Sequence, residues 1–151
     1  FLSTWAAIPA VPAGSLAVNW TRVLEVRSAV LRELERLRIA GEIGAPLDAI
    51  VEIYAGPETV AALEPLGEEL RFALITSEVH VHPVAARPDV AVPADPDAKS
   101  GLWLHVHASP ATKCVRCWHK RADVGTVAAH PELCSRCASN IDGPGETRRF
   151  A

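Results

Sequence analysis

The hydrophobic pattern of the first third of the chain predicts one long amphipathic helix. Apolar residues recur at helical spacing and form one stripe, while charged residues fall mainly on the other side. The stripe consists of Trp20, Val23, Leu24, Val30, Leu31, Leu34 and Leu37. Asn19 suits the N-cap, because its side chain can accept a hydrogen bond from the first turn. Gly41 and Gly44 follow, so we expect a helix over residues 20–39.

Alternating patterns beyond this helix predict a small sheet. In AIVEIYA, Val51 and Ile53 share one face, as in a strand with one buried side. Pro57 predicts the start of a short helix that ends by Pro65, since proline fits the first helical position. The predicted strands are residues 49–55, 70–75, 78–84 and 102–108. This order is typical of an α+β fold with a small, mostly antiparallel sheet covered by helices on one face.

Two segments lack such periodicity. Residues 1–18 are rich in proline and alanine, with Trp5 as the one large anchor, and are interpreted as a linker. Residues 85–100 are rich in proline, aspartate and alanine, and are predicted to form a mobile loop. The 151 residues contain no methionine, which favours a piece of a longer protein. We therefore expect a linker (1–18), an α+β domain (19–109) and a C-terminal module (110–151).

The four cysteines define that module. Cys114, Cys117, Cys134 and Cys137 form two C-x2-C pairs that are separated by sixteen residues. Each pair places two sulfurs on one tight turn, and the spacing is typical of a zinc site. Four thiolates complete a tetrahedral zinc site with no open position, which indicates one structural Zn²⁺. Because these thiols must stay reduced, the pattern favours the cytosol.

Charge and hydropathy exclude some classes. The net charge of −3 argues against a nucleic-acid binder, but residues 110–151 hold seven basic and four acidic residues. The basic ones are Lys113, Arg116, Lys120, Arg121, Arg136, Arg148 and Arg149. They either contact phosphates or offset the charge of the zinc-thiolate site. No apolar run is long enough to span a membrane, and no basic stretch precedes the apolar start, as a signal peptide requires.

Other candidate chemistry is sparse. The sequence contains no phosphate-binding glycine loop, no nucleophile elbow and no H-E-x-x-H motif. The C-x-x-C pairs could form redox dithiols, but two pairs at this spacing favour a metal. His119 and His130 lie inside the module and are predicted not to be ligands, since four cysteines complete the site. Trp118 either stacks on an unpaired base or packs over the sulfurs.

Two pairs of histidines occur in predicted strands. His80 and His82 are two residues apart, as are His105 and His107, so each pair shares a face. If the two strands were neighbours, the four imidazoles would cluster and could bind a metal. No carboxylate at a fitting spacing supports such a site. We interpret the histidines as the polar face of an amphipathic hairpin.

The C-terminal residues closely resemble the C-terminal end of bacterial isoleucyl-tRNA synthetases. The matching features are K-C-x-R-C-W-H at Lys113 to His119, D-V-G at Asp123 to Gly125, H-P-E-L-C-x-R-C at His130 to Cys137, S-N at Ser139-Asn140 and G-x-G-E-x-R-x-F-A at Gly143 to Ala151. The earlier chain is similar more loosely, through Phe1-Leu2, Trp5, the first helix and Glu69 to Phe72. Residues 83–112 and the histidine pairs are not part of the family pattern.

This resemblance implies a function that the spacing alone does not. Enzymes of this family are class I synthetases that activate isoleucine with ATP and charge its tRNA. Their catalytic domain, HIGH and KMSKS motifs and editing insertion have no counterpart in this chain, so we expect no ligase activity from it. The resemblance implies that residues 1–18 lead from the helical anticodon-binding domain and that the chain is monomeric and cytoplasmic. It also implies contact with the anticodon end of isoleucine tRNA, through candidates Arg116, Trp118, His119, Lys120, Arg121 and Arg136.

Two alternatives remain open. The same four-cysteine finger occurs in DNA-repair glycosylases, but those enzymes need an N-terminal Pro-Glu, whereas this sequence starts with Phe1-Leu2. A standalone interaction module could also use zinc as a staple alone. The S-N and G-E-x-R-x-F-A segments fit the synthetase better than either alternative.

Overall fold

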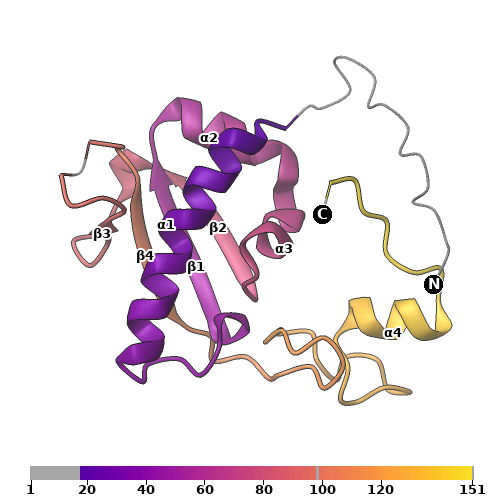
Figure 1. Cartoon of the computed structure of the whole chain (residues 1–151). Coiled ribbons are helices and arrows are strands. Elements are labelled where there is room, and N and C mark those ends of the chain that lie inside the picture. Colours follow the sequence, from indigo (N-terminus) through magenta and orange to yellow (C-terminus); the bar gives the residue numbers. More distant parts are fainter. Residues whose placement is uncertain (1–17, 98, 151) are drawn as a thin grey trace, which may run out of the picture.

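A computed structural model describes residues 18–97 and 99–150 of the chain (Figure 1). The predicted linker therefore lies almost wholly outside the described residues. The helices are α1 (Trp20–Ile39), α2 (Pro57–Leu63), α3 (Leu70–Leu74) and α4 (Ser135–Asp142), and the strands are β1 (Ala49–Ala55), β2 (Glu78–Pro83), β3 (Val92–Pro93) and β4 (Trp103–Ala108). This is the predicted α+β fold, with the four-cysteine module at its C-terminal end.

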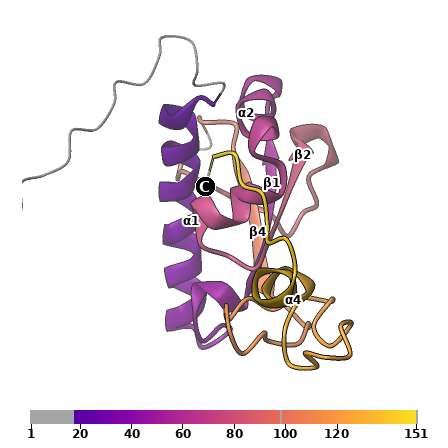
Figure 2. The same ribbon diagram turned by 90° about the vertical axis from the view of Figure 1, so that its right-hand side faces the viewer.

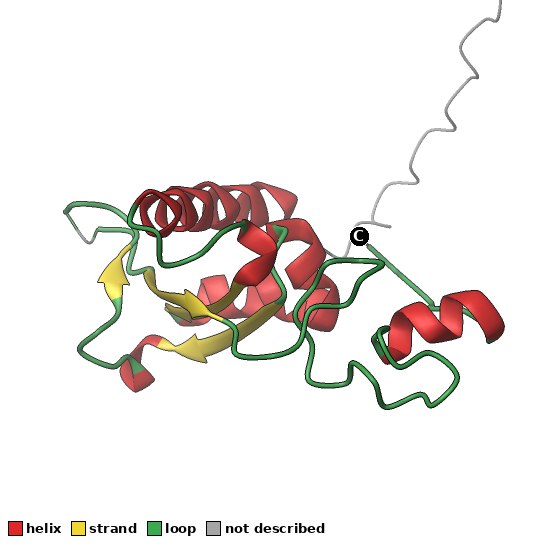
Figure 3. Cartoon of the chain, turned by 90° about the horizontal axis from the view of Figure 1, so that it is seen from below, coloured by secondary structure: helices red, strands yellow, loops and turns green. Residues whose placement is uncertain are grey.

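The four strands form one sheet in the order β2-β1-β4-β3. The central strand β1 pairs in parallel with β2 and antiparallel with β4, and β3 pairs antiparallel with β4. Helix α1 lies across one face of this sheet (Figures 1 and 3). The core forms there, because Val51 and Ile53 of β1 are fully buried together with Leu34 and Leu37 of α1. The opposite face of β1 carries Glu52, because it alternates with Val51 and Ile53.

Helix α1 has the predicted bounds and cap. The Asn19 side chain accepts a hydrogen bond from the backbone N–H of Arg22 at 3.1 Å. The predicted stripe is wrong at two positions, since Leu24 and Leu31 are exposed. Val26 and Ala29 fill the core-facing positions instead. The buried stripe is thus narrower than the predicted one. Leu24 and Leu31 directly follow the buried residues Val23 and Val30.

The strand predicted over residues 70–75 is wrong, because these residues form α3 and its left-handed end. An apolar run this short does not distinguish a strand from one buried helical turn. Gly67 adopts φ 46° and turns the chain just before the helix, and Ile75 ends the helix at φ 59°. Leu70 and Leu74 then lie one turn apart, and both are buried. The interpretation of a hairpin between residues 78–84 and 102–108 is also wrong, because β1 lies between β2 and β4.

The C-terminal module lies beyond one end of the sheet, next to α3 (Figure 2). It has a small buried cluster of its own, separate from the main core. Residues 84–86 form a 3-10 turn, and β3 follows in the segment predicted to be mobile. The mobility of that segment and the domain boundaries stay predictions. Within the part of the chain that the structure describes, no helix has the length and apolar character needed to cross a membrane.

Candidate metal centre and its surroundings

The first cysteine pair sits in a tight turn. Lys113 and Lys120 form an antiparallel bridge, and the Cys114 N–H donates to the His119 carbonyl at 2.9 Å. Inside this bridge the Trp118 N–H donates to the Cys114 carbonyl at 2.9 Å. These bonds fold the C-x2-C segment back on itself, so that Cys114 and Cys117 point to one side.

The second pair belongs to the start of α4. Cys134 precedes the helix in an extended conformation, and Cys137 lies in its first turn. Both are buried, and Leu133 packs against them. The helix therefore holds the second pair against the first.

The four sulfurs converge, because all lie within 4.8 Å of one another. The Cys117 and Cys134 sulfurs are 3.8 Å apart. A tetrahedral zinc site with bonds of about 2.3 Å requires sulfurs about 3.8 Å apart, so the cluster fits Zn²⁺. The backbone N–H of Cys134 also donates to the Cys114 sulfur at 3.4 Å, and Arg116 donates to the Cys137 sulfur at 3.7 Å.

The thiols of this cluster differ in acidity. Burial opposes ionisation of Cys114, but backbone N–H donors outweigh it and lower the pKa of its thiol to about 6. Burial raises the pKa of Cys134 to about 12 and also raises the pKa of Cys137. Thiolates at such close range repel one another unless a cation lies among them. The cluster thus needs a cation in order to hold four thiolates.

Cation–π contacts between three arginines and Phe72 of α3 join the module to this helix. Arg71, Arg136 and Arg148 place their guanidinium carbons 4.7, 5.1 and 4.0 Å from the centre of the Phe72 ring. His119 meets the same ring edge-on at 5.7 Å. Burial lowers the pKa of the His119 imidazole, and Arg136 lowers it further. Phe72 is therefore the aromatic centre of the contact between the two parts.

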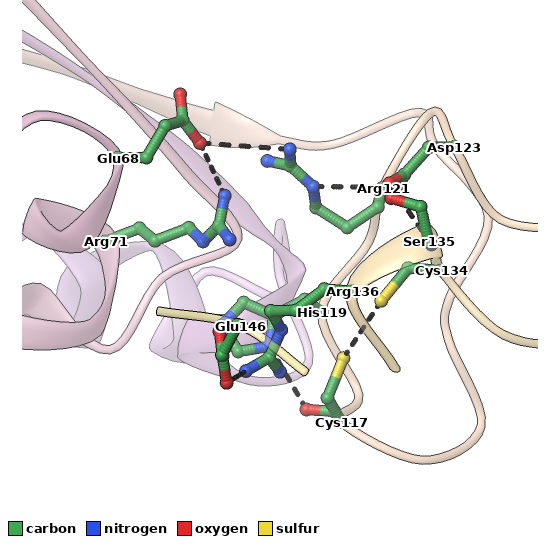
Figure 4. A pocket seen from close by; sticks show the side chains of 10 residues that line it. All are labelled: Glu68, Arg71, Cys117, His119, Arg121, Asp123, Cys134, Ser135, Arg136 and Glu146. Atoms are coloured by element: carbon green, nitrogen blue, oxygen red, sulfur yellow. Dashed lines mark hydrogen bonds and ion pairs between the residues drawn. The ribbon is translucent and has the colours of Figure 1, made fainter. Parts of the chain in front are cut away.

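A pocket of about 240 Å³ lies beside this contact (Figure 4). Arg71 donates to Glu68 at 2.5 Å, and Arg121 approaches the same carboxylate at 3.8 Å. Arg136 pairs with Glu146 at 2.9 Å. Burial opposes the charge of Arg136, but Cys117 and Glu146 raise the pKa of its guanidinium. Acidic and basic side chains balance in this pocket, so it is a salt-bridge network more than an anion site.

Of the six candidates for RNA contact, the structure leaves Arg116 and Trp118 exposed. His119 is buried against Phe72. Lys120 donates from its side chain to the Ser109 carbonyl at 3.2 Å and from its backbone to Ser77 at 2.6 Å. Arg121 and Arg136 form the ion pairs described above. These four residues hold the module to the rest of the chain.

Trp118 has an unusual backbone conformation. Its φ is 67°, in the left-handed region that costs a bulky residue about 1–2 kcal/mol. The residue is 61% exposed, whereas a residue that shields the sulfurs is expected to be buried. Burial of Trp118 therefore offsets little of the backbone strain at this position.

The histidine pairs lie on the open face of the sheet, separated by β1. Glu52 of β1 is in register with His80 of β2 and with His105 of β4. Its two carboxylate oxygens lie 2.7 Å from His80 Nδ1 and 2.6 Å from His82 Nε2. These bonds raise the pKa of His80; burial opposes ionisation of Glu52, yet the histidines lower the pKa of its carboxyl. The expected lack of a carboxylate partner is therefore wrong.

Comparison with known proteins defines the class of the module first. Residues 112–140 match the family described as "Zinc finger found in FPG and IleRS". The four-cysteine cluster and this family together support one structural Zn²⁺.

Relatives that align with the whole chain define the likeness more closely. It is 49% identical to isoleucine–tRNA ligase from Nitrosomonas europaea over 156 aligned residues, which cover 100% of this chain and 15% of the relative. It is 49% identical to the same ligase from Ectopseudomonas mendocina over 99% of this chain and 16% of the relative. The chain is thus similar along its whole length to one segment of these isoleucine–tRNA ligases, and it spans about 15% of their length.

Sequence reasoning missed several residues around these sites. Glu52 gave a weak signal, since it alternates with Val51 and Ile53 and so had to lie on the open face. Phe72 and Ser77 lie in segments that resemble the family, but no pattern indicated their contacts, because their partners are far away in sequence.

Proposed function

We propose that this chain is a non-catalytic, tRNA-binding part of a cytoplasmic isoleucine–tRNA ligase. In this proposal Cys114, Cys117, Cys134 and Cys137 ligate one structural zinc ion. The zinc holds a rigid turn that helps bind the anticodon end of isoleucine tRNA, while a class I catalytic domain elsewhere in the ligase uses ATP to charge it. The remainder of the ligase is the second partner of the chain.

The observation that carries the RNA-binding proposal is the exposure of Trp118. A large aromatic residue that is held at a strained turn and is 61% exposed is a suitable stacking platform for an unpaired base. Arg116 lies two residues away on the same turn and is exposed as well. A cation beside a stacking ring matches how proteins hold single-stranded RNA. The predominance of basic residues in 110–151 favours approach of the phosphate backbone.

The direct test measures discrimination between tRNAs. The zinc-loaded chain is titrated with isoleucine tRNA and with the same tRNA carrying a swapped anticodon, at several salt concentrations. We expect tighter binding of the native anticodon and a steep loss of affinity with added salt. Equal affinity for both tRNAs and for duplex DNA would exclude the proposal.

Replacement of Trp118 by alanine is expected to weaken binding of isoleucine tRNA by about 5- to 150-fold, because stacking of one base contributes about 1–3 kcal/mol. Zinc content should stay at one ion per chain. Trp118→Gly should give the same loss of affinity, since glycine accepts the left-handed conformation without strain. Fluorescence anisotropy of labelled tRNA and elemental analysis of zinc provide the two readouts.

Ile141→Ala is the matched control, because Ile141 is another exposed apolar residue of the same module. It should leave tRNA affinity unchanged. If Trp118→Gly lost zinc together with RNA binding, Trp118 would be a packing residue, and the stacking role would be rejected.

A further inference from the structure

We propose a second metal site on the open face of the sheet, in which Glu52, His80 and His82 bind one divalent transition-metal ion. The three residues come from two paired strands, and their ligand atoms all lie within 4.8 Å of one another. The site lies on the sheet, whereas the four-cysteine cluster lies in the C-terminal module. It does not depend on the proposed binding of tRNA.

The backbone sets the arrangement of the three ligands. His80 and His82 are two apart on β2, so both side chains leave the same face of the strand. Glu52 lies directly opposite His80 in the parallel register of β1 and β2. Its side chain is 17% exposed and stands between the two imidazoles, one oxygen to each. A carboxylate held in this way needs a small movement to take an ion between itself and both rings.

The distances between Glu52 and the two histidines show that this movement is small. Glu52 oxygens lie 2.6 and 2.7 Å from the histidine nitrogens. A zinc ion with bonds of about 2.0–2.2 Å to nitrogen and oxygen holds its ligand atoms about 3.3 Å apart. The two contacts must therefore open by about 0.6–0.7 Å, which rotation of the two partly exposed imidazoles supplies.

Neighbouring groups already orient both rings. Glu78 accepts a hydrogen bond from His80 Nε2 at 3.0 Å, leaving Nδ1 turned toward Glu52. Metal-binding histidines usually hold a carboxylate on their second nitrogen in this manner, which fixes the ring and raises its basicity. His82 stacks on Tyr54 with ring centres 5.0 Å apart and planes 21° apart. The site thus has three ligands and two groups that position them.

The donor set defines the class of ion. Two imidazoles and one carboxylate suit zinc, nickel, copper or iron(II), whereas magnesium and calcium prefer oxygen ligands alone. Three protein ligands leave positions open for water or a further ligand. This feature separates the site from the closed four-cysteine cluster.

The experiment titrates the zinc-loaded chain with Ni²⁺ and follows the histidine side chains by NMR. We expect a saturable second equivalent of metal that broadens the imidazole signals of His80 and His82 first. Native mass spectrometry must show that zinc stays bound, so that nickel has not displaced it. Failure to saturate at one nickel per chain, or broadening centred on other residues, would overturn the proposal.

Variants assign the ligands. Glu52→Gln keeps the size of the side chain and should weaken nickel binding by at least about tenfold, and His80→Asn should do the same. The matched control is the double variant His105→Asn/His107→Asn, which removes two histidines from the same open face of the sheet and should leave affinity unchanged. If this control lost as much affinity as Glu52→Gln, the three-residue assignment would be wrong.

Discussion

Removal of zinc is expected to unfold residues 113–140 while the sheet stays folded. The buried cluster of the module consists of three of the cysteines and Leu133, too little apolar area to stabilise a fold by itself. A structural zinc ion contributes on the order of 10 kcal/mol to folding, so its loss exceeds what the remaining contacts supply. The main core, with Leu34, Ile53 and Leu104 fully buried, does not include the cysteines.

Hydrogen exchange measures this outcome residue by residue. After chelation, the backbone amides of Cys114 and Trp118 should lose protection, because their bonds fold the first turn. Amides that pair β1 with β4 should keep theirs. Loss of protection throughout the chain in a single step would show that the module and the sheet fold as one unit, against the expectation.

Substitutions at two adjacent positions test the same expectation without a chelator. Cys114→Ser removes one sulfur of the cluster, and Val115→Ser introduces the same residue at a neighbouring position that is 56% exposed. We expect the first to abolish zinc binding and protection of residues 113–140, and the second to preserve both. Equal zinc content in the two variants would contradict the four-cysteine site.

Local patterns in the sequence sufficed where local physics decides the structure. The cap at Asn19 and the spacing of Val23, Val30, Leu34 and Leu37 determine α1 within one stretch of chain. The cysteine spacing likewise predicted a cluster, because each C-x2-C pair closes in a turn of its own. These features depend on neighbours three to seven residues away.

Other features depend on partners far along the chain. The short run at residues 70–75 became a helix because Gly67 turns the chain and packing buries Leu70 and Leu74 one turn apart. The placement of β1 between the two histidine strands is a matter of strand order, which alternation within each strand does not encode. The position of Glu52 between His80 and His82 therefore appeared only in the structure.

The same dependence on distant partners makes Ser77 a buried hydrogen-bonded link between the sheet and the zinc module. Ser77 is fully buried, donates from Oγ to the Leu47 carbonyl at 2.5 Å and accepts from the Lys120 N–H at 2.6 Å. Ser77→Ala deprives both backbone groups of a partner, and we expect it to lower the free energy of unfolding by about 2–3 kcal/mol. Because Lys120 closes the first cysteine turn, zinc should also transfer to a chelator faster.

Thr76, which directly precedes Ser77, offers a control whose expected effect on stability has the opposite sign. It is also fully buried, but its hydroxyl has no hydrogen-bond partner in the structure. Thr76→Val removes that unpaired group, keeps the shape and should raise the free energy of unfolding by up to about 1 kcal/mol without changing zinc transfer. Urea unfolding of the zinc-loaded variants measures both effects as opposite shifts of the midpoint at constant slope. Destabilisation of similar size in both variants would mean that burial of this segment, and not the Ser77 hydrogen bonds, joins the sheet to the module.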